Sequence, residues 1–102
     1  MQVFVDAHGD VRLADRDSFT VFAVHAPTDH EVENVGDALR AVAVGEIEDG
    51  HAWIFATAIT RLAHETGAGD DWRVGFDAMV EYAGVKGWLR EDGAIRAHIE
   101  FY

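Results

Sequence analysis

The segment Asp70–Lys86 constrains the fold of this chain most strongly, because its hydrophobic residues follow the period of an α-helix. Its larger apolar side chains recur at three- and four-residue spacing and fall within roughly 100° of arc on a helix. They are Trp72, Phe76, Met79, Val80 and Ala83. Acidic residues at the start of the segment and Gly87 after it are typical of helix ends. We predict a helix over residues 70–86 that packs this stripe against a β-sheet.

A second, thinner apolar stripe runs along another side of the same predicted helix. It consists of Val74, Ala78, Tyr82 and Val85. A helix with two apolar sides is expected to make contacts on both, and the second contact is either another helix of this chain or another subunit. Because symmetric dimers are the commonest oligomers, the second stripe favours self-association as a homodimer.

Runs of apolar residues, some alternating with polar ones, predict the strands of the sheet. We expect strands at residues 2–5, 11–13, 18–25, 88–89 and 95–101. Residues 18–25 are apolar on both faces, which predicts a central strand. The turns Ala7–Asp10 and Asp92–Gly93 separate the pairs at the two ends of the chain. In the last strand we expect four side chains to face inward: Ile95, Ala97, Ile99 and Phe101.

The segment Thr28–Glu31 has the spacing of a capping box. In that motif a Thr hydroxyl and a Glu carboxylate each accept a hydrogen bond from a free backbone N–H at the start of a helix. Val32, Val35 and Leu39 follow at helical spacing. We therefore predict a helix that is capped by Thr28 and has Asp29 and Glu31 in its first turn, where acidic side chains suit the positive end of the helix dipole.

Residues 43–66 are open to two interpretations. In the first, a single helix begins near Asp49, but it would place Trp53 opposite the apolar stripe of that helix. In the second, Asp49-Gly50 forms a tight turn between strands at residues 43–48 and 51–56, since this pair suits turns in which both residues have positive φ.

We prefer the hairpin, because it places Trp53 and Ile54 on opposite faces of a strand and gives both apolar side chains a contact. A short helix capped by Thr57 and ending at Gly67 would then follow. The order of elements predicts one α+β domain over residues 1–102, with a mostly antiparallel sheet and two to three helices packed on one face.

The composition restricts the partners of the chain. The 102 residues include 19 acidic and 8 basic side chains, for a formal charge of −11, and no basic cluster. Nucleic acids and anionic membranes would be repelled, so neither is expected as a partner. Cysteine is absent, which excludes disulfides and thiolate metal sites. No segment has the length of a membrane span or the pattern of a signal peptide, so we expect a cytoplasmic protein.

His51 and the acidic residues before it form the first candidate site. In the hairpin, Glu48 would lie across from His51, and Glu46 across from Trp53. A carboxylate beside an imidazole can orient it as a general base. The alternative is an exposed charge pair beside a turn, which usually contributes little to stability.

His98 and Glu100 form the second candidate site, on one face of the last predicted strand. This spacing could bring two ligands to one metal ion, but solvated strands normally carry alternating polar residues of this kind. Because no further ligands can be assigned, we predict no metal site and no cofactor.

The three tryptophans are many for a chain of this length. Trp72 lies on the buried stripe and is expected in the core. Trp53 and Trp88 are candidates for the wall of a pocket that takes a flat apolar ligand.

The leading functional hypothesis is a small, dimeric, non-catalytic module that binds a protein or a small apolar ligand. The alternative is a cofactor-free enzyme that uses a His/carboxylate pair, either His51 with Glu48 or His98 with Glu100, for proton transfer. A third hypothesis, an acidic protein that occupies a basic surface of a partner, ranks last because turns and arginines interrupt the acidic residues.

Overall fold

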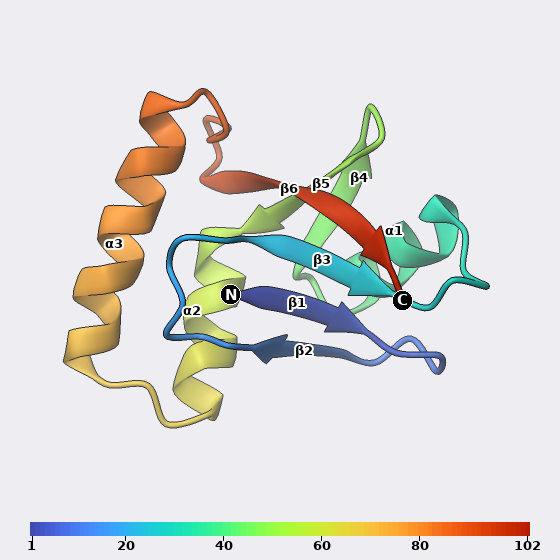
Figure 1. Cartoon of the computed structure of the whole chain (residues 1–102), viewed down its shortest axis with the longest axis horizontal. Helices are drawn as coiled ribbons and strands as arrows, with labels where there is room; N and C mark the ends of the chain where they lie inside the picture. The colour runs from blue at the N-terminus through green and yellow to red at the C-terminus, as the bar shows by residue number, and fades with distance from the viewer.

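Six strands and three helices make up the structure, a computed structural model that describes residues 1–102 (Figure 1). The strands are β1 (Gln2–Val5), β2 (Val11–Ala14), β3 (Ala23–Ala26), β4 (Gly45–Glu48), β5 (His51–Phe55) and β6 (Ala94–Phe101). The helices are α1 (Val32–Ala41), α2 (Ala56–Glu65) and α3 (Asp70–Val85). These elements confirm the predicted α+β class.

The sheet is mixed, with the strand order β2-β1-β3-β6-β5-β4. β3 pairs in parallel with both β1 and β6 at the centre of the sheet, whereas β1–β2, β4–β5 and β5–β6 are antiparallel. Parallel neighbours need a long crossover connection, and the segment between β3 and β6 contains all three helices. β3 is therefore a central strand, as predicted.

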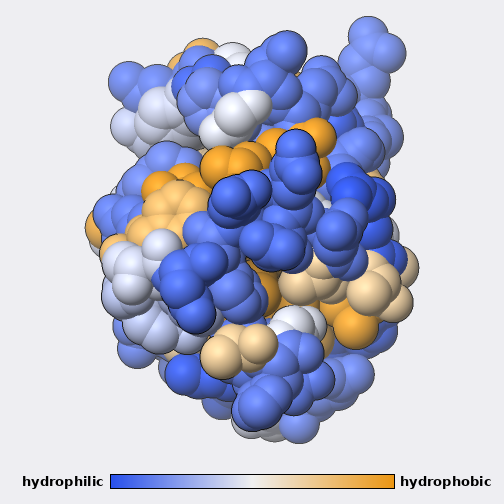
Figure 2. All heavy atoms as spheres, turned by 90° about the vertical axis from the view of Figure 1, so that its right-hand side faces the viewer, coloured by the Kyte–Doolittle hydropathy of each residue, from blue (hydrophilic) through white to orange (hydrophobic).

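The core lies between the sheet and the helices. α1 and α2 lie behind the sheet, and α3 stands beside the ends from which β3 and β6 start (Figure 1). Val24, Ile54 and Ile59 are completely buried and belong to the same core cluster. The predicted stripe of α3 is buried as well, with Val80 partly covered. The face of the molecule that points away from α3 carries mainly hydrophilic residues with smaller hydrophobic patches between them (Figure 2).

The preferred interpretation of residues 43–66 is confirmed: β4 and β5 form a hairpin, and a helix follows. Asp49 and Gly50 both have positive φ, of 52° and 79°. The predicted cap at Thr57 is wrong, because α2 begins at Ala56, directly at the end of β5, with Phe55 as its N-cap, two residues before the predicted cap. No loop separates the two elements, since the N–H of Ala56 still bonds to the carbonyl of Gly93 in the connection to β6.

The predicted strand over residues 18–25 is only partly correct, because pairing begins at Ala23. The carbonyls of Ser18 and Val21 instead accept hydrogen bonds of 2.8 Å from the ammonium group of Met1. Burial lowers the pKa of this ammonium below its usual value of 8.0. Residues 18–22 are thereby held as an irregular segment beside α3.

The predicted capping box at Thr28–Glu31 is also wrong. Glu31 is the N-cap of α1, and its backbone N–H donates to Oδ1 of Asn34 at 2.8 Å. The N–H of Thr28 bonds instead to the carbonyl of Tyr102, which extends the pairing of β3 with β6. Thr28 and Asp29 lie in a turn, in which the N–H of His30 donates to the carbonyl of Pro27, so the helix begins only at Val32.

The end of the chain departs from the prediction in two respects. Residues 88–89 do not form a strand, and only Leu89 makes an isolated bridge, to Ile95. In β6, Ile95 and Ala97 are buried as predicted, but Phe101 is 40% exposed. β6 extends beyond its antiparallel partner β5 at this end; Ile99 is partly buried against the core, whereas Phe101 lies outside the core cluster.

Candidate functional site

A pocket of about 350 Å³ lies between α3, the irregular segment 19–22 and the first half of β6. We call it the α3 pocket. Its lining residues are Phe19, Thr20, Val21, Phe22, His51, Met79, Tyr82, Ala83, Trp88, Ile95, Arg96 and His98. Three of the residues singled out in the sequence, His51, Trp88 and His98, therefore meet at one site.

The wall of the α3 pocket is mainly apolar. Met79 and Ala83 reach it from the buried stripe of α3, and Phe19 closes the opposite side. Tyr82 and Trp88, both lining residues, meet edge to face with ring centroids 6.0 Å apart. Aromatic rings in such a geometry form a firm apolar wall that leaves their polar atoms free to face solvent.

Trp88 is positioned by the connection between α3 and β6. Gly87 ends the helix with φ of 79°, in the left-handed region that favours glycine. The N–H of Trp88 then donates to the carbonyl of Ala83 at 2.8 Å, and its own carbonyl accepts from the N–H of Arg96 at 2.7 Å. Both sides of the Trp88 backbone are therefore held, one by the helix and one by β6.

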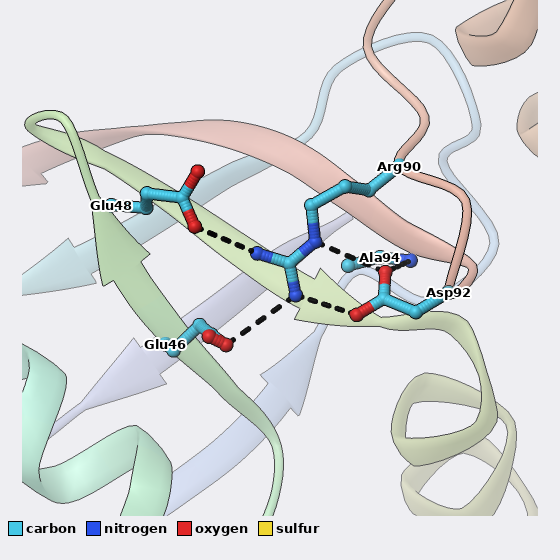
Figure 3. A network of polar contacts seen from close by, with 5 residues as sticks. All are labelled: Glu46, Glu48, Arg90, Asp92 and Ala94. Carbon is cyan, nitrogen blue, oxygen red and sulfur yellow. Dashed lines mark hydrogen bonds and ion pairs between the residues drawn. The ribbon is translucent and has the colours of Figure 1, made fainter.

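Arg90 holds the same connection against the β4–β5 hairpin (Figure 3). Its guanidinium contacts Asp92 through two hydrogen bonds of 2.7 and 3.0 Å, and reaches Glu46 and Glu48 at 3.4 Å each. The hydrogen bond between Arg90 and Asp92 raises the pKa of Arg90 and holds that of Asp92 below its usual value of 3.8. We call this group the Arg90 clamp. It joins the hairpin to the connection that carries Trp88.

Trp53 lies under the Arg90 clamp and outside the α3 pocket. The central guanidinium carbon of Arg90 is 5.2 Å from the centroid of the Trp53 ring. A cation over an indole face is favourable, so the ring of Trp53 stabilises the position of the Arg90 guanidinium. Of the two tryptophans predicted as pocket residues, the structure places only Trp88 at the pocket.

The first candidate pair is adjacent but not connected. Glu48 lies opposite His51 and Glu46 opposite Trp53 in the hairpin register, as predicted. Both carboxylates turn to Arg90, however, and no hydrogen bond or ion pair joins Glu48 to His51. The imidazole of His51 borders the α3 pocket instead.

The second candidate pair is connected. Nε2 of His98 is 2.9 Å from Oε1 of Glu100, and the other carboxylate oxygen is 3.3 Å from Nε2 of His25 on β3. The ring of His25 is stacked on Phe4 at a centroid distance of 4.9 Å. Glu100 thus bridges two imidazoles on one face of the sheet. No three His, Asp or Glu side chains are grouped so that they could hold a metal ion.

Arg96 also lines the α3 pocket, although it was not among the candidate site residues. The register that pairs Ala52 with Ala97 places His51 opposite His98, one residue further along. Since side chains alternate along a strand, Arg96 and His98 share the face turned away from the core. The alternation along the last predicted strand already places Arg96 beside His98, but the proximity of Arg96 to the α3 pocket depends on how α3 packs.

The second stripe of α3 is exposed. Val74 is 72% and Val85 80% accessible to solvent, and Ala78 and Tyr82 are exposed between them. No other element of the chain covers this face. None of the helices has the length and hydrophobicity needed to cross a membrane.

Comparison of the chain with models of protein families, with curated proteins and with solved structures gives no match.

Proposed function

We propose that this protein is a non-catalytic binding module that holds a small ligand with an apolar body in the α3 pocket. The observation that carries the proposal is the pocket itself, which has mainly apolar walls and a few polar groups. Small-molecule sites in proteins typically have this composition and volumes of roughly 300–1,000 Å³. The α3 pocket lies near the lower limit of that range, so a small ligand fits best.

The arrangement around Trp88 supports this proposal. Hydrogen bonds on both sides hold its backbone, and the Arg90 clamp fixes the connection on which it lies. A wall that is already in place before the ligand arrives loses little side-chain freedom on binding, which favours affinity.

Binding can be tested by NMR titration with 2-naphthamide, a neutral bicyclic aromatic compound. The amide signals of residues 19–22 and the indole N–H signal of Trp88 should shift, whereas that of Trp53 should not. Absence of any saturable shift up to the solubility limit would overturn the proposal.

Two tyrosines provide a matched pair of variants for the same titration. Tyr82 and Tyr102 are both 55% exposed, but only Tyr82 lines the α3 pocket. Tyr82→Ala should weaken binding about fivefold, because it removes one aromatic contact worth about 1 kcal/mol. Tyr102→Ala should leave the affinity unchanged.

We also propose that the module self-associates through the outer face of α3, which consists of Val74, Ala78, Tyr82 and Val85. The support is that these residues are exposed along one helix, although one edge of Tyr82 also contacts Trp88. Contiguous apolar patches of this kind mark interaction sites more often than isolated exposed residues do.

A second candidate function, proton-transfer catalysis, is favoured by one contact. His98 borders the α3 pocket, and Glu100 orients its imidazole at 2.9 Å, as a carboxylate does beside a general base. Hydrolysis of 4-nitrophenyl butyrate above the buffer rate, abolished in His98→Asn and reduced in Glu100→Gln, would support this function. Equal rates in all three proteins would exclude ester hydrolysis by this pair.

A further inference from the structure

The polar side of the α3 pocket has a definite charge preference. Resting on the proposed binding function, we infer that the ligand carries an anionic group, most simply a carboxylate, bound by Arg96 and approached by the imidazoles of His51 and His98. The ligand is then an aromatic or aliphatic carboxylic acid whose apolar body fills the space beside Trp88.

The composition of the lining is the first argument. The chain has 19 acidic residues, yet none of them lines the α3 pocket. The lining residues with polar side chains near the sheet are His51, Arg96 and His98, which are N–H donors or cations. The protein has a formal charge of −11, but the lining of this pocket has a guanidinium and no carboxylate. Its charge is complementary to an anion.

The unpaired guanidinium of Arg96 is the second argument. The other six arginines each use the guanidinium in a contact within the chain: Arg12 with the ring of Phe4, Arg16 with Thr66, Arg40 with Asp37, Arg61 with the carbonyl of Val42, Arg73 with Asp77 and Arg90 with Asp92. Arg96 has no hydrogen bond, ion pair or cation–π contact from its side chain. Its planar group of donors is therefore free to bind a carboxylate through two parallel hydrogen bonds.

The acidic residues on the same face of the sheet do not compete for Arg96. Both oxygens of Glu100 are engaged by His98 and His25. Glu46 and Glu48 are turned to Arg90. These three carboxylates thus leave the guanidinium of Arg96 free to bind an external anion.

The volume of the α3 pocket limits the size of the apolar body. A cavity of about 150 Å³ holds one benzene ring, and the α3 pocket has about 350 Å³. Two fused rings, or an aliphatic chain of similar volume, fit this space. A naphthalene carboxylate is therefore a suitable probe.

The charge preference can be measured by isothermal titration calorimetry with three ligands of the same shape: 2-naphthoate, 2-naphthamide and 2-naphthylmethylammonium. At neutral pH and physiological ionic strength, we expect 2-naphthoate to bind about tenfold more tightly than the amide, and the ammonium compound more weakly than both. The net negative charge of the protein would favour the opposite order, so this result has to come from the pocket.

Two arginine variants locate the effect. Arg96→Met should bind 2-naphthoate and 2-naphthamide with equal affinity, while Arg12→Met, which removes an exposed arginine without an ion pair from β2, should keep the tenfold difference. Arg96 is exposed, so its substitution should not affect folding, and circular dichroism of the variants checks this. A second variant, Arg96→Gln, should lose the preference for the acid in the same way.

The possible results separate the two proposals. If the wild-type protein binds the acid and the amide equally, or if Arg96→Met keeps the preference, the anion site is wrong and the apolar pocket stands. If none of the three ligands binds, the proposed function is overturned together with the anion site. If the ammonium compound binds most tightly, the net negative charge of the protein determines the order of the affinities, and the anion site is again wrong.

Discussion

The ring of Phe19 lies against the backbone of Gly75 in the middle of α3. A Cβ atom at residue 75 would stand 2.7 Å from Cζ and 2.8 Å from Cδ2 of that ring, which is closer than carbon atoms pack. Phe19 also contacts Trp72, with ring centroids 6.3 Å apart. The missing side chain at residue 75 therefore lets the segment 19–22 approach α3 and form one wall of the α3 pocket.

Substituting Gly75 with Ala should destabilise the protein although alanine favours helices. The gain in helix propensity is about 1 kcal/mol, but a methyl group inserted into this contact has to displace Phe19, and such overpacking costs about 1–3 kcal/mol. Gly84→Ala is the control, because a Cβ there meets only Leu89 at an ordinary 3.5 Å. Urea denaturation should give a lower free energy of unfolding for Gly75→Ala than for Gly84→Ala. The reverse order would contradict the contact.

Arg90→Met should lower the free energy of unfolding by about 1 kcal/mol, since it removes the contact with Trp53 and three ion pairs at once. Arg73→Met removes one exposed i,i+4 pair with Asp77 and should cost less than about 0.5 kcal/mol. Because the Arg90 clamp supports the connection that carries Trp88, Arg90→Met should also weaken binding of 2-naphthamide. Equal effects of the two variants on both quantities would show that Arg90 is an ordinary surface residue.

Asp6 should contribute stability that is lost in acid. Its Oδ1 accepts hydrogen bonds from the N–H groups of Asp10 and His8, and the one from Asp10 does most to hold the pKa of Asp6 below its usual value of 3.8. A carboxyl with a lowered pKa in the folded state stabilises the fold above the pKa of the unfolded chain. That stability is lost as the pH falls through the folded pKa.

The variant Asp6→Asn tests this pH dependence. Its free energy of unfolding, measured by urea denaturation between about pH 5 and pH 2, should fall less steeply with acidification than that of the wild-type protein. Parallel curves for the two proteins would show that the turn does not depend on the ionised carboxylate.

Local patterns in the sequence predicted the elements that depend on neighbouring residues. The pair Asp49-Gly50 suits a turn in which both residues have positive φ, and placing these two residues at the turn fixes the register of the hairpin. The stripe of α3 is likewise a property of one helix. The segment 18–22 was misassigned as a strand, because its alternation resembles one, while its carbonyl groups are bound by Met1 from 17 and 20 residues away.

The sequence predicted the pair of His98 and Glu100, which is in contact in the structure, but it did not predict which candidates share a pocket. His51 was expected with Glu48, His98 with Glu100, and Trp88 with Trp53. The structure brings His51, His98 and Trp88 to one pocket, because β5 pairs with β6 in a register that places the histidines opposite each other. Strand order and register between distant segments are set by the packing of the whole sheet. They could not be obtained from the spacing of residues along the chain.

Self-association through α3 should be visible as a doubled mass. Sedimentation equilibrium should give twice the chain mass of 11.2 kDa for the wild-type protein, and the double variant Val74→Gln, Val85→Gln should give the monomer mass. Val42→Gln is the control, because this valine is also exposed but lies after α1.

Glutamine leaves the charge unchanged, so each subunit keeps its formal charge of −11 and the two subunits repel each other. Added salt screens this repulsion and should strengthen the dimer. A monomer mass at all salt concentrations would contradict self-association through the outer face of α3.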